Sequence, residues 1–272
     1  MESAIVGPRS TDERALNPHR ALFAGGRNIF QKELQEWFRT KRFGVTALLT
    51  SLMLGAVPVI LFLNEGGLHD GRINSGYNGS MDAWMGLTLT LGAYLIVALT
   101  MGMIVKEEDA GTAQWIFTKP VSRKGYVLAK YAANVVAVVL GAVIVPSIVF
   151  IALTAATQSG GIHDWAAVAE GLAFASLNAS VVVAIVLGLS GVFRASAPIA
   201  GIAIGIGFVP FFFDRFVTEK VTMFFPVNIG AIATNAVRSE PLTPWQPVIS
   251  GIVILLVAVA FACYRIDRRQ LQ

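Results

Sequence analysis

The stretch VKEEDAGTAQWIFTKPVSRKGYVLAKYAA, Val105 to Ala133, connects two long apolar runs of the sequence. It contains three consecutive acidic residues, a short aromatic segment, a proline and several bases, whereas the sequence on either side is almost uncharged. An apolar run of about 20 residues is long enough for a helix to cross a bilayer. The stretch is therefore expected to be a polar connector between two membrane spans.

The composition supports a membrane protein. Of the 272 residues, 55% are hydrophobic and 14% are charged, whereas a soluble domain carries roughly 25% charged residues. The net charge of +4 does not indicate a nucleic-acid partner, because bases in a membrane chain usually mark its cytoplasmic side. Cys263 is the single cysteine, so the chain cannot form an internal disulfide.

The apolar pattern predicts an all-α, polytopic protein of the cell membrane with six transmembrane helices. Residues 28–272 are expected to form one transmembrane domain, preceded by a flexible cytoplasmic leader at 1–27. The predicted spans are 44–63, 84–105, 131–156, 166–193, 198–213 and 248–264.

The distribution of bases predicts the orientation. With six spans and a cytoplasmic N-terminus, seventeen of the 21 Lys and Arg residues lie on the cytoplasmic side, so both termini are expected there. The segment 214–247 is apolar but is interrupted by Pro226, Asn228 and Asn235. As a seventh span it would move the basic tail outside, so it is predicted to form external re-entrant or interfacial short helices.

The segment 28–43 predicts an amphipathic helix in the headgroup plane, with bases available to anionic lipid. A helix that packs on a cytoplasmic partner is the alternative, and the two can hold for different faces. The side chains expected on its apolar face are Phe30, Leu34, Trp37 and Phe38.

No catalytic, cofactor or metal site is expected. The phosphate-binding pattern G-x-x-x-x-G-K-[ST] is absent from the sequence, and no soluble stretch could house a nucleotide-binding domain. The pairs His69–Asp70 and His163–Asp164 lack metal-ligand spacing, so loop or helix-cap roles explain them better. Gly201 and Gly205, four residues apart in a predicted span, could let another helix approach closely.

Within the connector, Thr112 is predicted to cap a short helix at 113–117, Pro120 to end it, and Ser122 to cap the next helix. The acids at 107–109 are expected to pair with Lys106, Arg123 or Lys124. An ordinary charged loop is the alternative explanation. The apolar side chains of the short helix, which we expect to be exposed, are Trp115, Ile116 and Phe117.

The connector resembles that of the type-2 ABC exporter permeases. The shared order is EEDAGT at 107–112, a short apolar helix, KPVSR at 119–123, and then Lys130. The resemblance implies an interfacial helix, six spans, cytoplasmic termini and external re-entrant helices before the last span. It also implies that the short helix is a coupling helix, which docks into a separate ATPase subunit.

The resemblance therefore implies that ATP binds and is hydrolysed on partner ABC ATPase subunits, and that a second permease subunit, identical or not, completes the pathway. It does not name the cargo. A non-transporting mechanotransmitter and an intramembrane lipid-modifying enzyme are the alternatives. The residues implied in ATPase coupling are Glu107, Glu108, Gly111, Thr112, Trp115, Phe117, Pro120, Ser122 and Arg123.

Overall fold

The computed structural model describes residues 25–64, 73–118, 121–157, 164–213, 228–242 and 245–268. In these ranges all regular structure is helical, which confirms the all-α prediction. The residues outside these ranges include nearly all of the leader, both predicted histidine pairs except Asp164, Pro120, and residues 214–227 and 243–244 of the predicted external segment. The helices are α2 (Gly26–Arg39), α3 (Lys41–Thr50), α4 (Val57–Asn64), α5 (Ile73–Thr100), α6 (Val105–Asp109), α7 (Thr112–Phe117), α8 (Arg123–Val138), α9 (Val145–Thr157), α10 (Trp165–Ser190), α11 (Ser196–Phe213), α13 (Ile229–Val237) and α14 (Gln246–Arg268), with π-helical segments η2 (Ser51–Ala56) and η3 (Val139–Ile144).

The polytopic membrane architecture is confirmed. Among the described residues, five helical segments are long and apolar enough to cross a membrane. The predicted span 198–213 corresponds to α11, whose apolar part at Ser196–Phe208 is shorter than the other five, so its crossing stays a prediction. The five segments are Phe43–Ile60, Gly79–Asp109, Arg123–Thr157, Trp165–Ser190 and Gln246–Arg268.

Two prolines inside spans are accommodated by widened helical turns. The π-helical segment η2 ends two residues before Pro58, and η3 ends two residues before Pro146. A proline removes one backbone hydrogen bond and crowds the preceding turn, and a π-type turn absorbs the mismatch. The hydroxyl of Thr50 donates to the carbonyl of Gly141 in η3 at 2.7 Å, so the first and third spans are hydrogen-bonded where both helices widen.

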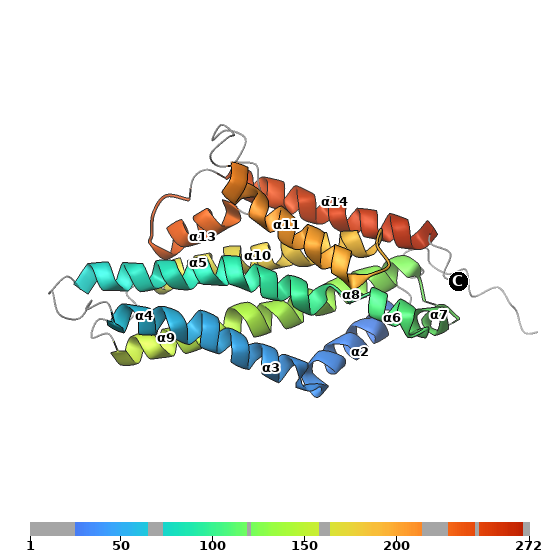
Figure 1. Cartoon of the computed structure of the whole chain (residues 1–272), viewed down its shortest axis with the longest axis horizontal. Helices are drawn as coiled ribbons and strands as arrows, with labels where there is room; N and C mark the ends of the chain where they lie inside the picture. The colour runs from blue at the N-terminus through green and yellow to red at the C-terminus, as the bar shows by residue number, and fades with distance from the viewer. Residues whose placement is uncertain are drawn as a thin grey trace, which may run out of the picture.

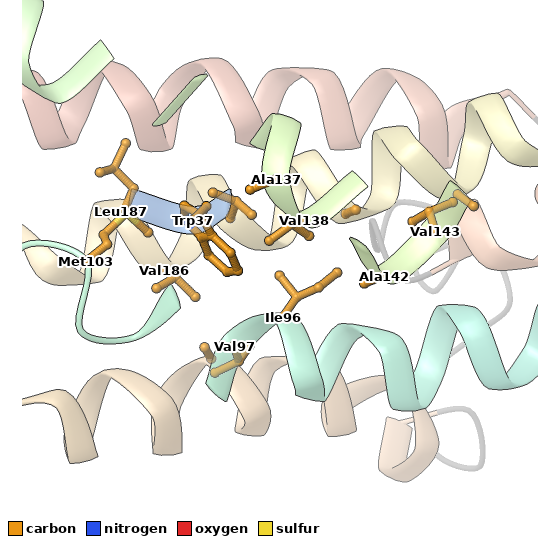
Figure 2. Close-up of a cluster of buried hydrophobic side chains, with 14 of the residues drawn as sticks. Trp37, Ile96, Val97, Met103, Ala137, Val138, Ala142, Val143, Val186 and Leu187 are labelled. Carbon is orange, nitrogen blue, oxygen red and sulfur yellow. The ribbon is translucent and has the colours of Figure 1, made fainter. Parts of the chain in front are cut away.

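The hydrophobic core lies between the spans. Helix α10 packs against α5, α13 and α14, and the buried rings of Trp84 and Phe150 stack with centroids 4.6 Å apart. Figure 2 shows Trp37 of α2 among labelled side chains of α5, α8 and α10, which belong to the same buried cluster. The helix before the first span is thus part of the protein core.

The connector helices α6 and α7 and the helix α13 lie toward opposite ends of the bundle. Helices α6 and α7 lie near the C-terminal end of α14, at the right of Figure 1, whereas α13 lies toward the left. Helix α13 is held by Arg238, which pairs with Asp82 of α5, and by Ser239, which donates to Asp164 at 2.9 Å. Asp164 also accepts from two backbone N–H groups of α10, so it is a helix cap, as the sequence favoured.

Candidate functional site

The face of α2 that packs on the protein differs from the predicted apolar face. It consists of Gly26, Ile29, Glu33 and Trp37, which are all buried. Gly26 allows a close approach to α8, since a Cβ atom there would lie 3.4 Å from the carbonyl oxygen of Gly125. Of the four predicted residues, only Trp37 lies on this buried face.

The remaining predicted residues lie at the edge of this buried face or on the exposed side of α2. Phe30 is partly buried against the core, and Leu34 is half-buried. Phe38 is exposed and its ring lies 4.5 Å from that of Phe43 at the start of the first span. One face of α2 therefore contacts the protein, and the predicted contact of its exposed face with lipid stays a prediction.

A cluster of charged side chains, Glu33, Glu107 and Lys130, lies buried where α2, α6 and α8 meet. Nζ of Lys130 lies 2.9 Å from Oε1 of Glu33 and 3.1 Å from Oε2 of Glu107. The side chain of Lys130 is 2% exposed. A buried ammonium group is costly unless it is paired, so these two carboxylates hold α2 and α6 against α8. We call this group the charged cluster.

Two further groups contact the carboxylate of Glu107. The hydroxyl of Tyr126 donates to Oε2 at 2.5 Å, and Nζ of Lys32 lies 3.3 Å from Oε1. The predicted partners of Glu107 were therefore wrong: its side chain points into the bundle toward α2 and α8, not toward Lys106, Arg123 or Lys124. Glu108 is half-buried on the same short helix.

Burial and neighbouring charges have opposite effects on the pKa values of side chains at the cluster. Burial raises the pKa of Glu33, the charge of Lys130 lowers it, and the carboxylates of Glu107 and Glu36 raise it again, with a raised pKa as the net result. For Lys32, burial lowers the pKa, but the attraction of Glu107 outweighs it and the pKa is raised.

A small polar cavity of about 70 Å³ adjoins the charged cluster. The indole N–H of Trp37 donates to the side-chain carbonyl of Asn134 at 3.2 Å, and the Asn134 amide donates to the Lys130 carbonyl at 2.8 Å. Glu33 and Trp37, one helical turn apart on α2, are thus paired with Lys130 and Asn134, one turn apart on α8.

The turn from α6 to α7 requires a glycine. Gly111 has φ of 67°, in the left-handed region that glycine adopts without strain. The predicted cap Thr112 is wrong: it is the first residue of α7, and its hydroxyl donates to the carbonyl of Glu107 at 3.1 Å. This bond attaches α7 to the backbone of Glu107, whose side chain belongs to the charged cluster.

The side chains of α7 divide into a packed side and an exposed side. Ala113 and Ile116 are buried, and Phe117 is half-buried with its ring 5.2 Å from that of Tyr126. The prediction that Ile116 and Phe117 are exposed was therefore wrong. Trp115 is 62% exposed, as predicted.

The start of α8 is anchored as the sequence predicted, and it gains an unexpected contact. Ser122 accepts a hydrogen bond from the N–H of Gly125 at 3.0 Å, which confirms its capping role. Arg123 donates to the carbonyls of Ile266 and Asp267 at 3.3 and 2.9 Å, at the C-terminal end of α14. The connector is therefore bonded to both the first helix and the last.

A chamber of about 230 Å³ lies between α5, α10, α11 and α13. Its lining is mainly apolar, with hydroxyl and amide groups from Thr90, Asn178 and Thr234. Gly201 and Gly205 lie on the exposed part of α11, where a Cβ would meet nothing within 4 Å. No described residue packs on them, so their predicted role in contacting another helix stays a prediction.

Sequence reasoning found the connector but missed the charged cluster. From the sequence, Lys130 stands out only by its place in the connector pattern, and Glu33 by itself has no distinguishing feature. The sequence does hold one signal. Glu33 and Lys130 are ionisable residues beside apolar helix faces, and each is followed four residues later by a side chain that can hydrogen-bond, Trp37 and Asn134 respectively.

The model of the ABC-2 family of transporter proteins matches residues 27–271. No curated protein matches the chain. The matched range includes the connector, the charged cluster and all of α2 except its first residue, Gly26.

Proposed function

The chain belongs to the ABC-2 family of transporter proteins, the membrane subunits of ABC transporters, and we propose that its connector, 106–130, couples it to a separate ATPase subunit. On this proposal, ATP is bound and hydrolysed by two partner ATPase subunits. The chain and a second permease subunit, identical or different, form the pathway between them.

The exposure of Trp115 carries the proposal. A six-residue helix is too short to be stable by itself, and α7 is held in place by its buried Ala113 and Ile116. The same packing presents a large indole at the end of the bundle. Aromatic side chains of this kind are common hot spots when a partner buries them.

The charged cluster offers a route by which movement of α7 could reach the spans. Thr112 is bonded to the backbone of Glu107, and the carboxylate of Glu107 is paired with Lys130 of the third span. Glu33 joins the same ammonium group to α2. A displacement of α7 by the ATPase would therefore act on α2 and α8 together, since Glu107 and Glu33 share the one ammonium group of Lys130.

The chamber supports a pathway role. It lies between three long helices, α5, α10 and α11, and the short helix α13. Movement of α5 relative to α10 or α11 would change its volume. The chamber and the connector are thus joined through the second span, which continues from α5 into α6.

The experiment compares Trp115→Ala with Trp165→Ala. Trp165 is a matched control, because it is 61% exposed, against 62% for Trp115, but begins α10 near the α13 end of the bundle. Both variants should insert normally, since exposed substitutions usually change stability by less than about 0.5 kcal/mol. Only Trp115→Ala should lose co-purification of an ABC ATPase. Equal retention of the ATPase by both variants would refute coupling through α7.

A further inference from the structure

The C-terminal end of α10 packs closely against α14 because small residues meet there. A Cβ atom at Gly188 would lie 3.4 Å from the carbonyl oxygen of Ala258. At Gly191 it would lie 3.3 Å from Cβ of Arg265 and 3.6 Å from Cα of Ala262. The turn that follows α10 is therefore held beside the last turns of α14.

This contact gathers three arginines around one open hollow of about 200 Å³. Arg194 comes from the turn after α10, and Arg265 and Arg268 come from α14, with Gly191 and Val192 completing the lining. Among the described residues none of the three forms an ion pair. Three guanidinium groups around one hollow repel one another, and an anion among them would relieve that repulsion.

The shape of the guanidinium group favours a phosphate as that anion. Its planar N–H groups match two oxygens of a phosphate at once. The guanidinium of Arg268 lies over the ring of Tyr264, with 4.4 Å from its carbon to the ring centroid. This stacking restricts the side chain and keeps its N–H groups beside the hollow.

The same face of α14 continues as an exposed apolar surface. Val257, Phe261 and Tyr264 are exposed and precede Arg265 and Arg268 at spacings of three and four residues, which places them on one side of the helix. Helix α14 has 23 residues, so it is about 34 Å long. Because a hydrocarbon core is about 30 Å thick, its last turn reaches headgroup level.

We infer that the hollow formed by Arg194, Arg265 and Arg268 binds the phosphate of an anionic phospholipid, whose acyl chains lie along the exposed face of α14. Basic pockets beside membrane spans bind headgroups of this kind. The excess of bases at this end of the bundle is typical of the cytoplasmic leaflet. The inference requires only that α14 crosses the membrane, so it stands apart from the coupling proposal.

The test is native mass spectrometry of the full chain released from nanodiscs of phosphatidylethanolamine with a minor fraction of phosphatidylglycerol. The variant is Arg265→Gln combined with Arg268→Gln. The control is Lys106→Gln combined with Lys124→Gln, which removes two exposed bases that do not line the hollow. We expect retained phosphatidylglycerol to fall at least about tenfold in the variant and to be unchanged in the control, because guanidinium–phosphate contacts are charge-assisted.

Equal losses in variant and control, or no enrichment of phosphatidylglycerol on the unaltered chain, would overturn the inference. Release of the bound phosphatidylglycerol by an equimolar amount of inorganic phosphate would also overturn it, because a free anion would then bind as well as the lipid does and the acyl chains would contribute nothing. A variant that keeps the lipid but loses a co-purifying ATPase would show that the arginines contact protein instead. If the double variant does not fold, Arg194→Gln, on the turn, replaces it with the same expected loss.

Discussion

Nζ of Lys130 lies 2.9 Å from Oε1 of Glu33, although the two residues are 97 positions apart in the sequence. Both side chains are buried. Glu33 belongs to α2, which precedes the first span in the sequence, and Lys130 belongs to α8, which follows it. Because the same ammonium group also pairs with Glu107, the attachment of α2 to the bundle and the attachment of the connector depend on one lysine.

Replacing that lysine should be costly. Lys130→Met leaves the carboxylates of Glu33 and Glu107 without their shared cation, so the free energy of unfolding should fall by about 3–5 kcal/mol. Lys124→Met, an exposed position on the same helix, is the control and should change it by less than about 0.5 kcal/mol. Thermal unfolding in detergent measures both changes. Equal shifts in melting temperature for the two variants would show that the charged cluster does not stabilise the fold.

The raised pKa of Glu33 predicts a pH dependence of stability. A carboxyl group whose pKa is higher folded than unfolded binds more protons when folded, so stability falls as pH rises from its ordinary value of 4.5 toward the folded value. Above the folded pKa this contribution is constant. Glu33→Gln should remove this decline in melting temperature, and a variant with an unchanged pH profile would contradict the assignment.

The left-handed turn at Gly111 makes a third prediction. Gly111→Ala meets no neighbouring atom within 4 Å, so its cost is the backbone strain alone, about 1–2 kcal/mol. Gly44→Ala is the control, because its Cβ is equally unobstructed but its position is helical and needs no positive φ. Faster hydrogen exchange at α6 and α7 should appear in the first variant and be absent from the second.

The order of helices and the polar connector could be predicted because they depend on local patterns. Long apolar runs require spans, and the Ser122 cap and the exposed Trp115 follow from short-range sequence chemistry. The prediction for Thr112 failed because Gly111 supplies the turn and the helix begins one residue earlier. Such boundaries are sensitive to single residues.

The charged cluster could not be predicted because it depends on how α2 crosses α8. The apolar pattern of α2 predicted Phe30, Leu34, Trp37 and Phe38 as one lipid-facing side, whereas the structure buries Trp37 together with Glu33 against the protein. A charged residue on a helix is normally assigned to the solvent side. Only the position of Lys130, far along the sequence, makes burial of Glu33 favourable.

The exposed glycines of α11 predict a subunit contact. If a second permease packs on Gly201, a leucine there would separate the helices, whereas Gly44→Leu, equally unobstructed on α3, would not. Light scattering of the purified transporter should show loss of the second permease only for Gly201→Leu. Loss in both variants, or in neither, would exclude this face as the contact.

In the proposed coupling, Trp115 contacts the ATPase directly. Its most direct test is a photo-reactive phenylalanine analogue at position 115, activated in membranes that contain the assembled transporter, with the same analogue at position 165 as the control of matched exposure. We predict a covalent adduct with an ABC ATPase from position 115 and none from position 165. An assembled transporter that yields no ATPase adduct from position 115 would contradict the account.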